Sequence, residues 1–171
     1  MAQEWNIRSR AHACQGCGQA FRDRQPCVSA LFDAASGYER RDYCPACWEQ
    51  PRPPDDPQPF SVWQGEFREP EKAAREEPVR RETAESLLRR LIALEDPAKT
   101  NVVYVLAVML ERSRQLVERD VRPHESGGLL RVYEHRRSGD TFIVLDPRLR
   151  IEAIGEVQRQ VIAMLESGAT A

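Results

Sequence analysis

The sequence predicts an α+β protein in which a small β module built around cysteines precedes a helix–helix–β-hairpin–helix unit. Three observations lead to this expectation. Two Cys-x-x-Cys pairs, Cys14/Cys17 and Cys44/Cys47, enclose a stretch with the pattern of a β-hairpin. Five prolines in residues 51–59 then interrupt regular structure. Beyond them, apolar residues recur at helical spacing, then in two short β-like runs, and again at helical spacing.

The cysteine module is predicted to occupy residues 1–49. Residues 5 and 7 are apolar between polar neighbours, as expected of a short strand leading into the first cysteine pair. Residues 28–32 and 38–43 flank a loop of small and polar residues at 33–37. We therefore expect a hairpin that connects the two cysteine pairs.

Residues 50–82 are predicted to form a proline-rich and charged linker. The prolines of residues 51–59 make its first part an extended spacer. Residues 66–81 alternate acidic and basic side chains with few apolar ones, as in a solvated segment. Between these parts, residues 60–63 contain Phe60 and Trp63, which are costly to leave in water. We expect residues 60–63 to dock on a folded part of the chain.

The unit over residues 83–166 is predicted to begin with two helices. Apolar residues form a helical stripe from 84 to 94, and Asp96-Pro97 then supplies an N-cap and a first-turn proline. We expect the second helix to run to about residue 119. The remaining elements follow from turn and spacing signals: a β-hairpin at 129–135 and 141–146, a closing helix at 151–166 and a flexible tail at 167–171.

Composition and charge exclude several classes of protein. A net charge of −2 gives no general attraction to nucleic acid. No apolar run approaches the roughly 18 residues of a membrane span. The N-terminus lacks the charged and then apolar order of a secretory signal. We therefore expect a cytoplasmic protein, without a membrane segment, whose cysteines are reduced and available to a metal.

The paired cysteines Cys14, Cys17, Cys44 and Cys47 are the predicted metal ligands. Each Cys-x-x-Cys places two thiolates on one tight turn, and two such turns can close a tetrahedral site around Zn²⁺. Gly18 permits the positive φ that such a turn needs, and Pro45 stiffens the second turn. Backbone N–H groups and nearby arginines are expected to offset the thiolate charge; the candidates are Arg22, Arg24, Arg40 and Arg41.

The pattern Cys14-x-x-Cys17-Gly18, a hairpin and then Cys44-Pro45-x-Cys47 resembles the zinc-ribbon family over residues 14–47. The resemblance implies a structural zinc and a small β-sheet, with no activity common to the family. A weaker likeness along the whole length, carried by residues 5–7, 59–63 and 105–112, links the chain to small uncharacterised bacterial proteins.

The same pattern also resembles rubredoxin, which implies a redox iron as the alternative to zinc. The paired Cys-x-x-Cys turns, the glycine after the first and the proline in the second are shared, with 26 residues between Cys17 and Cys44. Trp48 departs from the rubredoxin pattern, because it stands where that family keeps a second glycine. An all-thiolate site holds either metal, so both remain open at this point.

Other candidate residues have simpler explanations. Cys27, the fifth cysteine, is a reactive thiol or a small buried hydrophobe, and its place at the start of a strand favours the second. We expect His12 to be a surface or metal-neighbouring residue and not a ligand. Residues 124–128 lack the lysine of a phosphate-binding loop and form a flexible turn. The basic tip at 135–137 could contact phosphate, but a solvated hairpin tip is the simpler interpretation.

No set of nucleophile, base and oxyanion donors can be recognised, and a closed four-cysteine site has no position for substrate. The sequence therefore favours a non-enzymatic interaction or regulatory protein, whose hairpin and residues 60–63 contact a protein partner or another part of the chain. A nucleic-acid-binding zinc ribbon and an iron electron-transfer module are the alternatives. The nucleic-acid surface would combine basic and aromatic side chains: Arg8, Arg10, Arg40, Arg41, Tyr38 and Tyr43.

Overall fold

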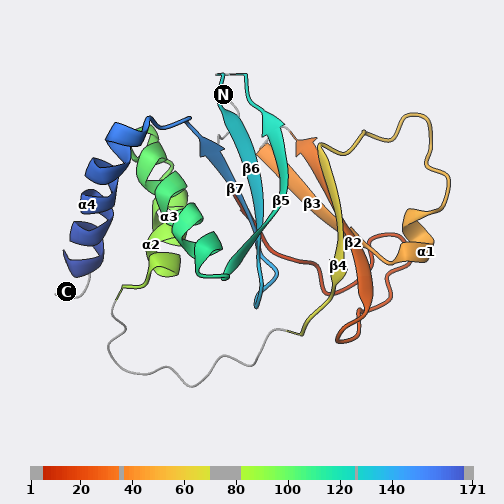
Figure 1. The fold of residues 1–171 in the computed structure, drawn as a ribbon. Coiled ribbons are helices and arrows are strands. Elements are labelled where there is room, and N and C mark those ends of the chain that lie inside the picture. Colours follow the sequence, from red (N-terminus) through yellow and green to blue (C-terminus); the bar gives the residue numbers. More distant parts are fainter. Residues whose placement is uncertain (1–5, 35–36, 70–81, 126, 168–171) are drawn as a thin grey trace.

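The computed structural model describes residues 6–34, 37–69, 82–125 and 127–167. The molecule has three layers, with helices on one face of a four-stranded sheet and a three-stranded sheet on the other (Figure 1). The elements along the chain are β1 (Asn6–Arg8), β2 (Pro26–Ala34), β3 (Gly37–Tyr43), α1 (Pro45–Trp48), β4 (Ser61–Glu66), α2 (Ala84–Leu94), η1 (Pro97–Lys99), α3 (Thr100–Arg112), β5 (Leu116–Pro123), β6 (Leu129–His135), β7 (Thr141–Asp146) and α4 (Ile151–Ser167).

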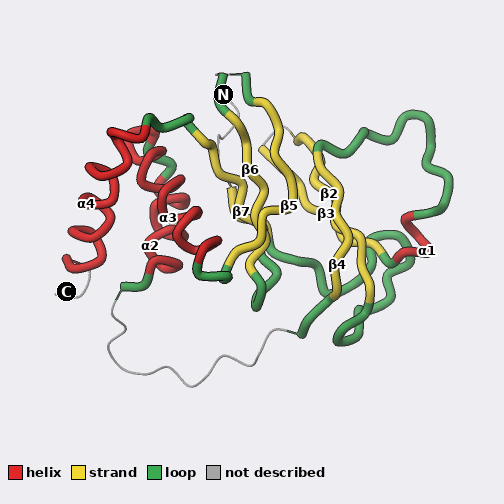
Figure 2. The backbone as a smooth tube through the Cα atoms, viewed as in Figure 1, coloured by secondary structure: helices red, strands yellow, loops and turns green. Residues whose placement is uncertain are grey.

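The α+β prediction is confirmed, and most predicted elements are present (Figure 2). The two expected hairpins are β2–β3 and β6–β7, and each is antiparallel. The capping of α2 explains its start, because Thr83 and Ser86 exchange side-chain and backbone hydrogen bonds in a capping box. Asp96 accepts a hydrogen bond from the Ala98 N–H and opens η1, which leads into α3. None of the described helices is long and apolar enough to cross a membrane.

The main hydrophobic core lies between the helices and the four-stranded sheet and extends into the three-stranded sheet. Val103 and Leu106 of α3 and Phe142 of β7 are completely buried in it. Leu31 of β2 and Trp63 of β4 belong to the same cluster, so the core joins both sheets. The docking predicted for residues 60–63 is thereby confirmed for Trp63, whose side chain packs inside the molecule.

Part of the predicted linker is a strand, which corrects the assignment of residues 50–82. Strand β4 pairs with the free edge of β2 and completes the three-stranded sheet in the order β3-β2-β4. Alternate residues of β4 point inward, and Phe67 just beyond it is only 3% exposed. Pairing with β2, which is distant in sequence, stabilises this six-residue segment as a strand. Residues 70–81 of the predicted linker lie outside the described residues.

The prediction that the second helix reaches residue 119 was wrong, because α3 ends at Arg112. Arg114 has a left-handed φ of 61°, and the N–H groups of Arg114 and Gln115 donate to the carbonyls of Glu111 and Leu110. These are the bonds of a Schellman helix end, with an arginine where glycine is usual. The chain then turns into β5, the edge strand of a sheet with the order β1-β7-β6-β5.

The first strand belongs to the four-stranded sheet and not to the cysteine module. We predicted a short strand at residues 5–7, within the module of residues 1–49, that leads into the first cysteine pair. Strand β1 instead pairs antiparallel with β7, at the far edge of the four-stranded sheet from β5, whereas residue 5 lies outside the described residues. The N-terminal segment therefore crosses the interface between the two sheets before it reaches the first cysteine.

Candidate metal centre

The first cysteine turn is a small closed loop held by backbone hydrogen bonds. The Gly18 N–H donates to the Cys14 carbonyl at 2.8 Å, and the Cys14 N–H donates to the Gln19 carbonyl at 2.9 Å. Gly18 has a φ of 71°, as its position after the second cysteine predicted. An isolated bridge between Ala13 and Ala20 closes the loop at its base.

The second cysteine turn lies at the end of β3 and opens the short helix α1. The N–H groups of Cys47 and Trp48 both donate to the Cys44 carbonyl, at 3.1 and 3.0 Å. Pro45 occupies the first helical position, where its missing N–H costs nothing. The hairpin β2–β3 thus returns the chain from the first turn to the second, as predicted.

The four sulfur atoms of Cys14, Cys17, Cys44 and Cys47 converge, with all of them within 4.8 Å of one another. A tetrahedron of sulfurs around Zn²⁺ at 2.3 Å has edges of about 3.8 Å, so the thiols need to contract by only about 1 Å. None of the five cysteines forms a disulfide. The donor set and its geometry therefore fit one metal ion held by four thiolates.

Gly16 allows the two turns to approach each other, a role that sequence analysis did not recognise. A Cβ atom placed on Gly16 would lie 2.8 Å from the Cys47 Cβ and 3.1 Å from the Cys47 Sγ. Any larger residue there would push the turns apart. The sequence offered no signal for this contact, because it depends on how the second turn packs on the first.

The cysteine sulfurs lie at the edge of the protein, in a polar but partly desolvated setting. Cys14 is buried, Cys44 and Cys47 are half-buried, and Cys17 is exposed. Burial alone would raise the pKa of the Cys14 thiol, but backbone hydrogen bonds, the strongest from Cys44, outweigh it and lower the pKa to about 6. A hydrogen bond with the Cys44 side chain raises the pKa of Cys47 to about 12. Neighbouring thiolates repel one another, and a bound cation removes that repulsion.

Backbone groups, as expected, help to offset the thiolate charge, whereas the arginines at 40 and 41 have other partners. The Cys44 N–H lies 3.2 Å from the Cys14 Sγ. Arg40 is buried against Asp42 at 2.9 Å, and Arg41 pairs with Glu39 at 2.8 Å. The predicted charge compensation by these two arginines was therefore wrong. Arg22 and Arg24 are exposed, and Arg24 lies 3.9 Å from the Asp23 carboxylate.

A small second core supports the cysteine turns. Phe21 and Phe67 stack at 5.5 Å between ring centroids, and Cys27 and Cys14 are buried beside them. Cys27 is 3% exposed, which confirms the buried position predicted for it, and burial raises its pKa. His12 is exposed and packs edge-on against Phe67 at 5.9 Å.

An aromatic cluster beside the second turn is the feature that sequence analysis missed most clearly. The rings of Tyr43 and Trp48 lie 5.5 Å apart, and the Arg52 guanidinium lies 3.7 Å from the Trp48 ring centroid. All three residues are half-buried. Arg52 comes from the proline-rich segment, whose path along the cysteine module no local pattern indicates.

The arginines predicted to bind nucleic acid are mostly engaged inside the protein. The side chain of Arg40 is 1% exposed and that of Arg10 is 8% exposed. Arg8 donates to the Tyr38 carbonyl, and Arg41 pairs with Glu39. A nucleic-acid strand cannot reach Arg40, so the predicted basic surface does not form as expected.

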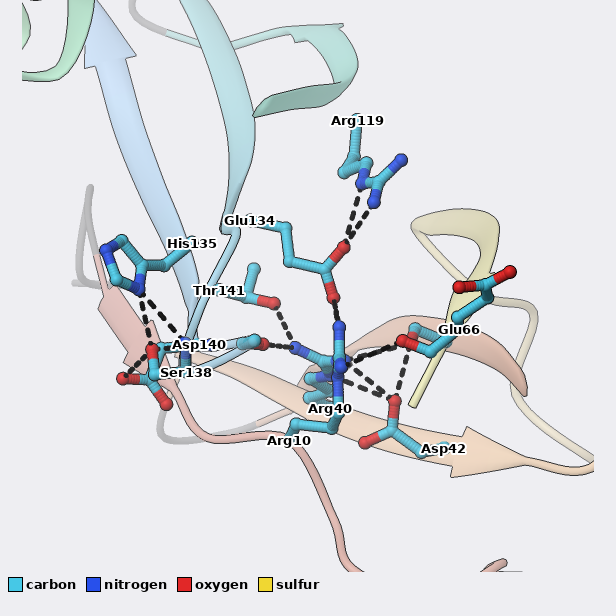
Figure 3. A network of polar contacts seen from close by, with 12 residues as sticks. Arg10, Arg40, Asp42, Glu66, Arg119, Glu134, His135, Ser138, Asp140 and Thr141 are labelled. Carbon is cyan, nitrogen blue, oxygen red and sulfur yellow. Dashed lines mark hydrogen bonds and ion pairs between the residues drawn. The ribbon is translucent and has the colours of Figure 1, made fainter. Parts of the chain in front are cut away.

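The turn between β6 and β7 contains a serine, a histidine and an aspartate, but not in a catalytic order (Figure 3). Ser138 Oγ lies 3.0 Å from His135 Nδ1 and donates to Asp140 at 2.8 Å. In a catalytic triad the histidine stands between the other two residues, whereas here the serine does. The His135 Nδ1 also accepts the Ser138 N–H, so these contacts stabilise the turn.

Comparison with protein families, curated proteins and solved structures finds no match for this chain. The class of site therefore rests on the four converging cysteines alone, and it is a possible four-cysteine metal site consistent with a zinc-ribbon-like knuckle.

Proposed function

We propose that this chain is a non-enzymatic, zinc-binding interaction or regulatory protein of a reducing compartment such as the cytoplasm. The observation that carries the proposal is the convergence of four thiols from two short turns. Four protein ligands complete the tetrahedral shell of Zn²⁺ and leave no position for water or substrate. The metal then has a structural role, because it links two turns whose own hydrophobic core is small.

The aromatic cluster of Tyr43, Trp48 and Arg52 supports the interaction role. Tryptophan, tyrosine and arginine are the residue types that contribute most often to binding energy at protein interfaces. Here they lie together, half-buried, directly beside Cys44 and Cys47. The metal fixes the turn that carries Trp48, so loss of the metal would also remove the binding surface. Trp63, which is buried in the main core, takes no part in this surface.

A capture experiment tests the interaction role. The tagged chain retains a specific protein from lysate of its native host, and Trp48→Ala with Arg52→Ala abolishes that retention. The matched control is Arg150→Ala, an exposed arginine directly before α4, and α4 lies at the opposite end of the molecule from α1 (Figure 1). Retention that is equal for all three proteins would contradict the proposed surface.

Nucleic-acid binding remains the second candidate, and Trp48 with Arg52 is the pair that would serve it. Aromatic stacking on bases and arginine contacts to phosphate require the same residue types. Binding of single-stranded DNA or RNA at low salt, lost with Trp48→Ala, would favour this candidate over a protein partner. Absence of any binding at low salt would remove it.

A further inference from the structure

A crevice lined by charged residues runs between the two sheets, where their edge strands β4 and β5 lie side by side (Figure 1). Two adjoining cavities occupy it, with volumes of about 130 and 590 Å³. Glu66, Arg68 and Arg136 line both cavities, so the two cavities share part of their wall. None of the four cysteines lines either cavity.

Arginines from four separate segments converge on the smaller cavity. Arg10 precedes the first cysteine turn, Arg68 follows β4, Arg119 belongs to β5 and Arg136 begins the β6–β7 turn. The Arg119 guanidinium reaches across to β4, where it would lie 3.8 Å from a Cβ on Gly65. Only the fold brings these residues together.

Carboxylates neutralise the inner arginines of the crevice, and these contacts fix their positions. Glu134 is 4% exposed and binds Arg10, Arg119 at 2.7 Å and Arg40 at 3.4 Å (Figure 3). Arg10 also donates to the backbone oxygen of Glu66 at 3.0 Å, while the Glu66 carboxylate points away from it. The inner wall is therefore rigid, with more arginine than carboxylate around it.

The outer arginines, Arg68 and Arg136, are exposed, and within the described part of the chain their side chains have no ion pair or hydrogen bond. Other described arginines are of both kinds: Arg131 binds Glu118 and Asp146, whereas Arg112 and Arg150 also have no side-chain ion pair or hydrogen bond among the described residues. Across both cavities, six arginines face four carboxylates among the described residues, in a chain of net charge −2. The positive excess is thus local to the crevice.

We propose that this crevice binds an oxyanion of the phosphate class, with Arg68 and Arg136 as its principal ligands and Arg119 at its floor. Guanidinium groups present paired N–H donors whose spacing matches two phosphate oxygens. The smaller cavity takes the phosphate group, and the larger one has room for an organic substituent such as a sugar. The inference is independent of the metal and of the proposed interaction role.

Phosphate titration of the purified full-length chain tests this proposal. Inorganic phosphate raises the thermal midpoint saturably, relative to chloride at equal ionic strength, because it binds the folded state. Arg68→Gln with Arg136→Gln weakens phosphate binding at least about tenfold, since it removes two charge-assisted contacts. The matched control, Arg150→Gln with Arg159→Gln, removes the same charge from the region of α4 and leaves binding unchanged.

Two outcomes would overturn the proposal. One is a shift of the thermal midpoint with phosphate that is no larger than the shift with chloride. The other is an equal loss of phosphate binding in both double variants. A second titration with a sugar phosphate distinguishes the sources of the anion. Tighter binding than inorganic phosphate assigns the site to a phosphate ester, and equal binding assigns it to the free ion; either result supports the site.

Discussion

Gly16 and Gly18 have different roles at the first cysteine turn. Gly18 has a positive φ with open space around its Cα, so it serves the backbone of its own turn. Gly16 faces Cys47 and sets the distance between the two turns. A glycine that sets a distance between ligands acts on metal affinity more directly than one that only shapes a loop.

We expect Gly16→Ala to weaken metal binding more than Gly18→Ala does. The added methyl at position 16 meets the Cys47 Cβ at 2.8 Å and separates the sulfurs, whereas at position 18 it meets nothing within 4 Å. A loss of about tenfold in affinity, or about 1.4 kcal/mol, is expected for Gly16→Ala relative to Gly18→Ala. Competition with a zinc chelator measures both. Equal affinities would show that the turns can separate without loss of the site.

Glu134 is the residue whose titration affects stability most clearly. Burial alone would raise its pKa, but Arg10, Arg40 and Arg119 outweigh that effect and lower the pKa below its usual value. Its ionised form therefore stabilises the folded state above the ordinary carboxyl pKa, and that contribution disappears as pH falls through the lowered pKa.

We expect the free energy of unfolding to fall between about pH 5 and pH 3, and Glu134→Gln to flatten this dependence. At neutral pH the same substitution costs about 3–5 kcal/mol, because it leaves buried arginines without their shared carboxylate. Urea unfolding at a series of pH values measures both effects. Glu156→Gln is the control, since that carboxylate is exposed on α4 and pairs with Arg159. An identical pH profile for wild type and Glu134→Gln would contradict the role of this network.

At the scale of elements, the β6–β7 turn connects the four-stranded sheet to the three-stranded sheet. Gly139 has a φ of 71°, and its carbonyl accepts a hydrogen bond from Arg40 of β3 at 2.5 Å. Arg10 packs directly against the Gly139 Cα, where a Cβ would lie 2.5 Å from the Arg10 Cζ. Glycine at position 139 therefore avoids both the strain of a left-handed backbone and a close contact with the Arg10 guanidinium.

We expect Gly139→Ala to destabilise the protein by about 2–4 kcal/mol, from backbone strain and from the clash together. Gly127→Ala is the matched control, because Gly127 also has a positive φ, 86°, but open space around it. We expect Gly127→Ala to lower the free energy of unfolding by about 1 kcal/mol, from backbone strain alone. Urea midpoints of the two variants give the difference. Equal costs would mean that Arg10 can move away without penalty.

Local patterns predicted the elements that depend on local signals, and missed those that depend on distant partners. The apolar stripe from 84 to 94, the Asp96-Pro97 cap and the turn around Gly139 are visible in the sequence and led to correct elements. The end of α3 has Arg114 at the left-handed position, where glycine is usual, so no local sequence signal predicts where this helix ends. Strand β4 forms because it pairs with the edge of β2, and residues 61–66 alone do not indicate that pairing.

The same distinction between local signals and distant contacts applies to the candidate site. Cysteine spacing predicted which four cysteines converge, because metal coordination favours that spacing whatever the rest of the chain does. The aromatic cluster and the arginine crevice were not predicted. Arg52, Arg68, Arg119 and Arg136 are far apart in sequence, and only the completed fold brings them to their neighbours.

At the scale of the whole molecule, two hydrophobic cores of different size stabilise different parts of the fold. The large core joins the helices and both sheets, while the small one contains Phe21, Cys27 and Phe67 beside Cys14. We expect metal removal with a chelator to loosen residues 12–25 and 43–49 and to leave the large core folded. Amide hydrogen exchange measures this by region: protection is lost around the cysteines and kept in α3, β6 and β7. Global unfolding, or no change anywhere, would contradict this division.

The central claim is that Cys14, Cys17, Cys44 and Cys47 hold one structural zinc ion. Elemental analysis of protein purified without added metal tests it most directly, together with the visible absorption spectrum. We expect about one zinc per chain with no visible absorption, retained by Cys27→Ser and lost by Cys44→Ser with Cys47→Ser. Iron with a coloured thiolate spectrum would contradict the choice of zinc. Metal-free protein, or metal that survives removal of Cys44 and Cys47, would contradict the site itself.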